Sequence, residues 1–382
     1  MKYITVTENK NTNRFALITM SLIPNAYLLK SFLSIGFDFT VILYLLLYIF
    51  LLFTLINTKF KMQIKLTIFD LLFYFWLLVL FIGLFYSPFP MQGAYKISKL
   101  IFMAYSLTVF IRIYVKNYNE YIYLLKSILL SSLILSVIVT INFVSLGMPF
   151  GRFSFYGAHP IPLGMMGAIS SLISLYLYSS KKINIWYLAV SFLLGLIIVL
   201  LSSSKGPVLS LVAGITFFLP TYFKDLKRST LLTLVFITIF YFISQTEQFS
   251  SLTERFVETE GAQSTIERLE LYENAKNYFY HNPILGSGVG VFKDYYPHNL
   301  FLEILGEGGV LLLLILILFI CIIIYKYWVY ILSPFRKIKP ISLSLFTASF
   351  VVLLVSYTYV DLKIMFISIG LLTIENTINS KN

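Results

Sequence analysis

Charged residues are scarce in this sequence of 382 residues. Asp, Glu, Lys and Arg together make up 12% of the chain, and the apolar set AVILMFWYC makes up 58%. A soluble domain carries about 25% charged residues. Because so little charge cannot cover a water-exposed surface, the composition excludes cytosolic enzymes, nucleic-acid-binding proteins and disordered regulators. It is typical of a polytopic membrane protein.

Cysteine is almost absent, and no leader peptide is visible. The single cysteine, Cys321, allows no disulfide within the chain and no cysteine-based metal site. The N-terminal segment continues into an apolar stretch without a small-residue cleavage site, so we expect a retained cytoplasmic tail rather than a signal peptide.

Long apolar segments recur along the whole chain. A helix needs ~20 mostly apolar residues to cross the hydrocarbon layer, so the sequence predicts an all-α, polytopic integral membrane protein with about twelve transmembrane helices. The predicted spans are 15–33, 35–56, 66–86, 97–115, 121–146, 160–179, 185–202, 206–222, 230–245, 299–325, 338–358 and 360–376.

Lys and Arg concentrate in alternate loops, which orients these spans. Cytoplasmic loops carry the excess of positive charge, so both termini are predicted to be cytoplasmic. The outer side then receives all three histidines (His159, His281 and His298) and one long loop, 245–298. We therefore expect a single membrane domain, 1–382, with 245–298 as an extracytoplasmic loop subdomain that bears a short helix.

The long loop has helix and turn signals of its own. Ser264 and Glu267 have the spacing of a capping box, which predicts a helix over about 265–281 that ends before Pro283. The segment Gly-Ser-Gly-Val-Gly at 286–290 then predicts a turn that permits close backbone approach.

A polar stripe enters the next apolar span at its outer end. Asn299, Glu303 and Glu307 fall within one ~100° sector of a helix that follows His298. A carboxylate at the bilayer centre costs about 2.5–3.5 kcal/mol on insertion scales. Two carboxylates on one stripe therefore predict either a polar cavity or a firm partner. Structural hydrogen bonds between helices and a catalytic role explain the two carboxylates equally well.

Three segments of the chain resemble the O-antigen polymerase and O-antigen ligase superfamily. The first runs from Arg268 through Asn282-Pro283 and the glycine segment to Pro297-His298-Asn299 and Glu303 to Gly309. The others are 152–160, with His159 where the family has Asn, and 201–206, with Lys205 where it has Arg. A fainter likeness is to the cell-shape and division peptidoglycan polymerases, which act on similar lipid-linked sugars.

The resemblance implies glycosyl transfer outside the membrane, from undecaprenyl diphosphate to a sugar hydroxyl. No metal-ligand cluster is visible on the outer side and no cofactor is expected, so cations of the chain would neutralise the leaving group. The implied catalytic residues are His298, Arg268 and Glu303. The diphosphate would be bound by Arg152, Lys205 and Arg268, and weaker substrate contacts would come from His159, Asn299, Glu307 and Tyr272.

A surface-polysaccharide (O-antigen or capsule) polymerase in the bacterial inner (plasma) membrane is the function that this resemblance favours. Its partners would be an undecaprenyl-diphosphate-linked oligosaccharide, the lipid bilayer, and chain-length regulator and flippase proteins, with no nucleic acid. An O-antigen ligase that uses lipid A core as acceptor, a flippase or transporter, and a non-catalytic assembly partner remain alternatives. Arg152 as an interface anchor and Lys205 as a snorkelling side chain are the structural alternatives for those two cations.

Overall fold

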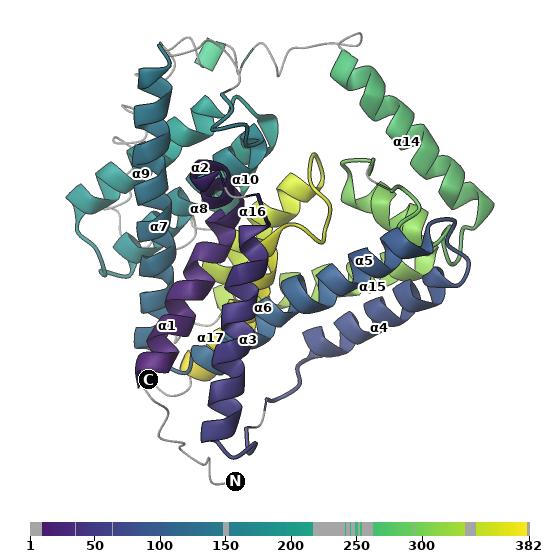
Figure 1. Cartoon of the computed structure of the whole chain (residues 1–382), viewed down its shortest axis with the longest axis horizontal. Helices are drawn as coiled ribbons and strands as arrows, with labels where there is room; N and C mark the ends of the chain where they lie inside the picture. The colour runs from purple at the N-terminus through teal and green to yellow at the C-terminus, as the bar shows by residue number, and fades with distance from the viewer. Residues whose placement is uncertain are drawn as a thin grey trace.

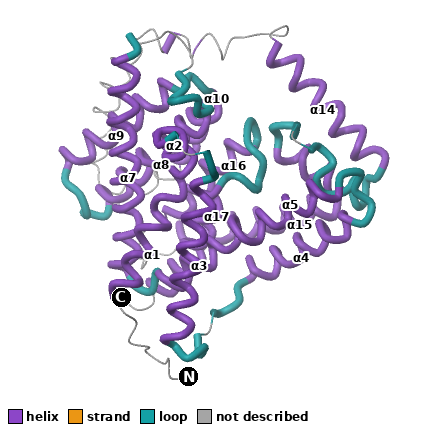
Figure 2. The backbone as a smooth tube through the Cα atoms, in the orientation of Figure 1, coloured by secondary structure: helices purple, strands orange, loops and turns teal. Residues whose placement is uncertain are grey.

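The chain folds almost entirely into helices in a computed structural model that describes residues 10–34, 36–62, 64–147, 153–216, 241, 245, 249–250, 253, 263–293, 295–332 and 341–379. No strand occurs among these residues (Figure 2). The helices are α1 (Lys10–Leu22), η1 (Ile23–Asn25), α2 (Ala26–Leu33), α3 (Phe39–Asn57), α4 (Ile68–Leu84), α5 (Pro90–Lys99), η2 (Leu100–Tyr105), α6 (Ser106–Tyr114), α7 (Tyr118–Ser145), α8 (Pro160–Ser179), α9 (Ile185–Leu201), α10 (Lys205–Thr216), α14 (Gln263–His281), α15 (Leu300–Leu332), α16 (Ile341–Leu353) and α17 (Lys363–Asn379).

These helices confirm an all-α, polytopic membrane protein. In the described parts of the chain, 6 helices are long and apolar enough to cross a bilayer, and α4, α9, α10 and α16 are shorter apolar helices. Each predicted span other than 230–245 contains a helix, and that span lies outside the described residues apart from Tyr241 and Gln245. The number of crossings and the division into a membrane domain and a loop subdomain stay predictions.

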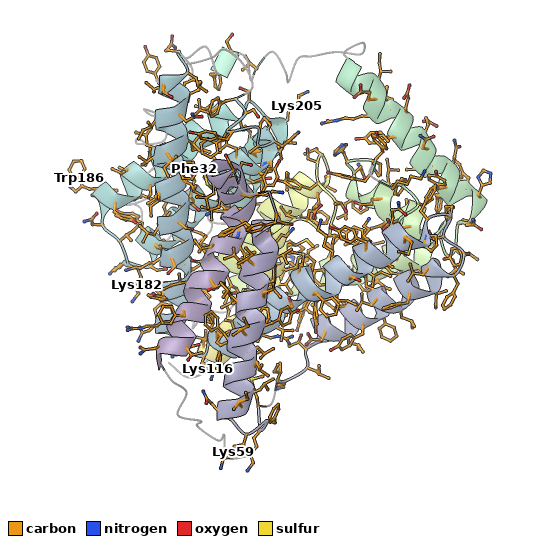
Figure 3. All side chains as sticks on the ribbon, in the orientation of Figure 1. Phe32, Lys59, Lys116, Lys182, Trp186 and Lys205 are labelled. Atoms are coloured by element: carbon orange, nitrogen blue, oxygen red, sulfur yellow. The ribbon has the colours of Figure 1, made fainter. Side chains whose placement is uncertain are left out.

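The helices alternate in direction, so chemically related loops gather at the same end of the molecule. The start of α1 and the end of α17 lie together at the lower end in Figure 1, whereas α14 lies at the upper right. Asn13 Nδ2 donates to Glu120 Oε1 at 2.6 Å, which joins the start of α1 to the start of α7. In Figure 3, Lys59 and Lys116 lie toward the lower end and Lys205 toward the upper end. Lysines that the charge pattern predicts on opposite sides thus lie at opposite ends.

Small residues let α8 and α9 pack closely at the centre of the bundle. Any side chain at Gly167 or Gly195 would collide with the other helix, and Ser171 Oγ donates to the Gly167 carbonyl at 2.9 Å. Almost the whole of α8 is buried. Close backbone approach through Gly and Ser is the usual way to associate helices in lipid, where burial of apolar surface drives little.

The glycine segment, residues 286–290, packs tightly between α4, α5 and α15. Tyr86 OH donates to the Leu285 carbonyl and Ser87 Oγ to the Val289 carbonyl, both at 2.8 Å. Gly288 has a φ of 95°, and a Cβ on it would lie 2.6 Å from the Gly83 carbonyl oxygen. The predicted close backbone approach is confirmed, and it anchors the segment that leads to His298.

The predicted loop helix is confirmed as α14, and it is only partly packed. Ala275, in its second half, is buried against Val291 and Phe292. Ile266 and Leu269, in its first half, are exposed because this part of the helix extends beyond the glycine segment and α15 (Figure 1). The side chain of Ser264, the predicted cap, lies outside the described residues.

Candidate active site

The predicted site residues come from the ends of several helices. His159 is the N-cap of α8, where its Nδ1 accepts from the Ile161 backbone N–H at 3.3 Å. Lys205 is the first residue of α10, and His298 lies two residues before α15. Helix N-termini carry partial positive charge, so an anion that approaches this region meets both side-chain and backbone donors.

His298 is held in an unusual backbone conformation and is partly buried. Its φ is 49°, in the left-handed region that few non-glycine residues adopt. Its ring lies tilted against that of Tyr296, with centroids 4.5 Å apart. Its Nδ1 is buried and has no hydrogen-bond partner among the described residues. A buried polar atom without a partner is expected to have a functional explanation.

Two side chains from other helices influence this imidazole. Burial, then the nearby Arg268 guanidinium, then His159 lower the pKa of His298 below its ordinary value of 6.5. The structure therefore brings together side chains from α14, from the start of α8 and from the segment before α15. An imidazole with a lowered pKa is neutral at pH 7 and able to accept a proton.

Arg268 is well placed to bind an anion. It lies on α14 with an exposed side chain and makes no ion pair or hydrogen bond within the described part of the chain. Tyr272, one turn further along α14, is half-buried. An exposed guanidinium without a carboxylate partner keeps all of its N–H donors for a ligand.

The other residues predicted to contact the substrate lie in different parts of the structure. Lys205 is half-buried at the start of α10, toward the upper end of the bundle (Figure 3). Arg152 lies outside the described residues. The backbone N–H of His159 donates to Tyr27 OH at 3.3 Å, which ties the start of α8 to α2.

Glu303 and Glu307 have the firm partner that their stripe predicts, and it is Lys96 of α5. Lys96 Nζ donates to Glu303 Oε1 at 2.6 Å and to Glu307 Oε1 at 2.8 Å. Thr358 Oγ1 also donates to Glu303, and Tyr359 OH donates to Glu307 Oε2 at 2.8 Å. We call these five residues the Lys96 cluster. Its two carboxylates are at most 1% exposed, so the cluster joins α5, α15 and the α16–α17 turn inside the protein.

Asn299 has a structural task. Its Oδ1 accepts from the backbone N–H groups of Phe301 and Leu302 at 3.0 and 3.2 Å, so it caps α15. Its Nδ2 donates to the Leu354 carbonyl at 3.4 Å. The roles predicted for Asn299, Glu303 and Glu307 in substrate binding or catalysis stay predictions.

Sequence reasoning did not single out three lysines near this region. Lys96 completes the cluster just described, and Lys99 and Lys363 both contact Asp361. A usable signal was present, because Lys96 and Lys99 lie one turn apart at the outer end of a predicted span. Charges at such a place need a partner or a ligand.

An apolar cleft adjoins the Lys96 cluster. It holds about 740 Å³ of space, part of which is open to the surroundings, and its walls are almost entirely apolar. Phe69, Trp76, Phe319 and Phe346 contribute aromatic rings, and Tyr359 lines the cleft while its hydroxyl bonds to Glu307.

Residues 189–317 match the family model for O-antigen ligase. This match confirms the resemblance to the O-antigen polymerase and ligase superfamily and supports a membrane enzyme of that type. The matched region runs from α9 into α15 and contains Lys205, Arg268 and His298, as well as both acids of the Lys96 cluster. No curated protein and no solved structure matches the chain.

Proposed function

We propose that this protein is a surface-polysaccharide polymerase of the bacterial inner membrane. It transfers a glycan from undecaprenyl diphosphate to a sugar hydroxyl of a second lipid-linked repeat unit, on the outer side. The observation that carries the proposal is the arrangement around His298. A partly buried imidazole that is neutral at pH 7 lies near an arginine without a carboxylate partner among the described residues, inside the region that matches the O-antigen ligase family.

The reaction assigns a role to each group. The acceptor hydroxyl oxygen forms a bond to the anomeric carbon as the bond from that carbon to the diphosphate oxygen breaks. His298 accepts the hydroxyl proton, and the electron pair of the broken bond leaves with the lipid diphosphate. Arg268, Lys205 and Arg152 neutralise that charge, which a preorganised cation does without any proton transfer. Direct displacement inverts the anomeric centre.

Tyr296 supports this assignment through its own protonation state. Burial and the Asp361 and Glu303 carboxylates raise the pKa of the Tyr296 phenol to about 12. The phenol therefore stays protonated at every physiological pH. It packs against the His298 ring as an uncharged group and does not compete with the imidazole for the acceptor hydroxyl proton.

The test uses purified protein in detergent with its undecaprenyl-diphosphate-linked repeat unit, in the presence of EDTA. A ladder of products supports a metal-independent polymerase. Product formation that EDTA abolishes and a divalent cation restores would overturn the metal-independent mechanism.

The ligase is the second candidate, because the matched family model is described as O-antigen ligase. No ladder, with transfer once lipid A core is added, would support this candidate. No transfer to either acceptor, together with movement of the intact lipid-linked unit across a liposome membrane, would overturn both enzyme functions in favour of a flippase.

A further inference from the structure

A second group of cationic side chains lies apart from His298. Lys99 Nζ contacts Asp361 Oδ1, and Lys363 Nζ lies 3.4 Å from the same oxygen. The side chains of Lys99, Lys363 and Asp361 are 22%, 16% and 33% exposed. The two lysines share Asp361, the Asp38 carboxylate also acts on Lys363, and the exposed parts of Lys99 and Lys363 leave the group open to a ligand. We call it the Lys99–Lys363 pair.

We expect the pair to lie at the outer membrane boundary. Lys99 lies within the continuous helical segment Pro90–Tyr114, and Lys363 is the first residue of α17. The apolar segments that predict these spans begin at 97 and 360, so both lysines are predicted at the outer edge of the hydrocarbon layer. The amide N–H groups of the first turn of α17 add to the positive potential. This is the depth at which the phosphates of a membrane lipid lie.

The apolar cleft begins next to this pair. Leu100, adjacent to Lys99, and Tyr359, two residues before Asp361, both line the cleft. Met365, two residues after Lys363, lines it as well. A pair of lysines above an apolar, aromatic-lined cleft fits an amphiphile with an anionic head and a long hydrocarbon chain.

We propose that the Lys99–Lys363 pair binds the diphosphate of the acceptor, and that the isoprenoid chain of this acceptor lies in the cleft. This inference rests on the proposed polymerase function, which needs two lipid-linked molecules at once and therefore two diphosphate sites. Arg268, Lys205 and Arg152 serve the donor, whose diphosphate is the leaving group. The acceptor keeps its own diphosphate, so no bond forms or breaks at the Lys99–Lys363 pair.

Asp361 competes with the ligand for the two lysines. When a diphosphate binds, it displaces Asp361 from at least one of them, because each ammonium gains more from a multiply charged anion than from one carboxylate. Removal of the carboxylate charge should therefore strengthen ligand binding. A purely structural ion pair predicts the opposite, since loss of either partner would then be equally harmful.

The experiment measures binding of radiolabelled farnesyl diphosphate to the full-length protein in phosphatidylcholine nanodiscs. We expect two sites per chain in the wild type. The variant K99Q/K363Q should lose one site, with each single lysine change weakening that site roughly tenfold. The variant K205Q/R268Q should lose the other site.

Two variants provide matched comparisons. D361N should bind farnesyl diphosphate at the Lys99–Lys363 pair at least as tightly as the wild type. K276Q removes an exposed lysine of α14 that pairs with Glu273, and should change neither site. Weakening of the same site by D361N to the degree caused by K99Q would assign the group a structural role and overturn the proposal.

Competing ligands distinguish the kinds of lipid. Inorganic pyrophosphate should compete roughly tenfold or more less effectively than farnesyl diphosphate, because it cannot fill the cleft. Phosphatidylglycerol in the nanodisc should leave the site available, whereas full competition by this lipid would make the pair a general phospholipid site and overturn the proposal.

The numbers of sites separate this inference from the proposed function. One wild-type site, lost in K205Q/R268Q and unaffected by K99Q/K363Q, would overturn the acceptor site and leave the donor assignment standing. One wild-type site, lost in K99Q/K363Q and unaffected by K205Q/R268Q, would overturn the donor assignment instead. In activity assays, the lysine variants should raise the KM for the acceptor and leave kcat within about twofold.

Discussion

Two polar groups flank the start of α15, and they differ in whether the protein supplies a counter-charge. In the Lys96 cluster one ammonium bridges two buried carboxylates, and Thr358 and Tyr359 add hydroxyl donors, although Glu303 Oε2 has no hydrogen-bond partner among the described residues. Five residues before Glu303, the His298 imidazole has a buried Nδ1 without a partner in the described part of the chain, and the nearby Arg268 makes no ion pair there. Carboxylates that hold helices together have their cation within the protein, whereas a site for an anionic substrate keeps its cation unpaired.

Removal of the imidazole should have the largest effect on activity. His298→Ala should lower the initial rate of glycan transfer about 10²- to 10⁴-fold, because it removes the general base. The thermal unfolding midpoint in detergent should stay close to that of the wild type, since His298 completes no hydrogen-bond network in the described structure. A variant that keeps its rate within twofold would remove His298 from the reaction.

A substitution in the Lys96 cluster should instead lower the stability of the protein. Lys96→Met would leave Glu303 and Glu307 buried without a cation, and we expect a loss of about 3–5 kcal/mol in the free energy of unfolding. Thermal and denaturant unfolding in detergent measure this loss. K96R is the control that keeps the charge, and E303Q/E307Q on the K96M background should recover part of the stability. Unchanged stability with lost activity would instead make Lys96 a substrate ligand.

The sequence pattern predicts the ion-paired half of the comparison only in part. Glu303 and Glu307 lie on one stripe by helical spacing alone, and that spacing requires a partner. Their partner could not be identified, because Lys96 is 207 residues from Glu303 and 211 from Glu307 in the sequence. Local periodicity carries no information about which helix packs against which.

The half without an ion pair is more visible in the sequence. His298 and Arg268 both lie in a segment that resembles the O-antigen polymerase and ligase superfamily, and that resemblance implies catalytic roles for them. Their mutual approach was not predictable, because it depends on how α14 packs against the glycine segment and α15. The positive φ of His298 likewise follows from the tertiary packing of its segment, since no neighbouring residue type demands it.

The glycine segment sets where His298 lies, so its glycines offer a finer test. Gly288→Ala should destabilise the protein by more than about 1 kcal/mol, because it adds a Cβ at a φ of 95° and 2.6 Å from the Gly83 carbonyl oxygen. Gly147→Ala is the matched control. Gly147 also has a positive φ, of 77°, but a Cβ there meets nothing within 4 Å among the described residues.

Unfolding midpoints of the two alanine variants separate strain from close packing. Equal destabilisation would mean that the backbone conformation alone matters at Gly288. A larger loss of stability for Gly288→Ala, accompanied by a fall in transfer rate, would show that the packing of the glycine segment sets the position of the imidazole.

The smallest expected effect is a shift in pH dependence. Burial, the Arg268 cation and His159 lower the pKa of His298, so kcat/KM should fall only below pH 6.5, as the imidazole becomes protonated. Arg268→Gln removes the stronger of the two side-chain influences and should raise that pKa, which moves the acid limb to higher pH by less than about one unit.

A profile of log kcat/KM from pH 5 to 8 measures this midpoint independently of the rate that the variant loses by binding diphosphate less well. Lys276→Gln, on the same helix but paired with Glu273, should leave the midpoint unchanged. An unchanged midpoint in Arg268→Gln would contradict the electrostatic contact between α14 and His298. In that case the arginine would act on the diphosphate alone, and the imidazole would owe its low pKa to burial and to His159.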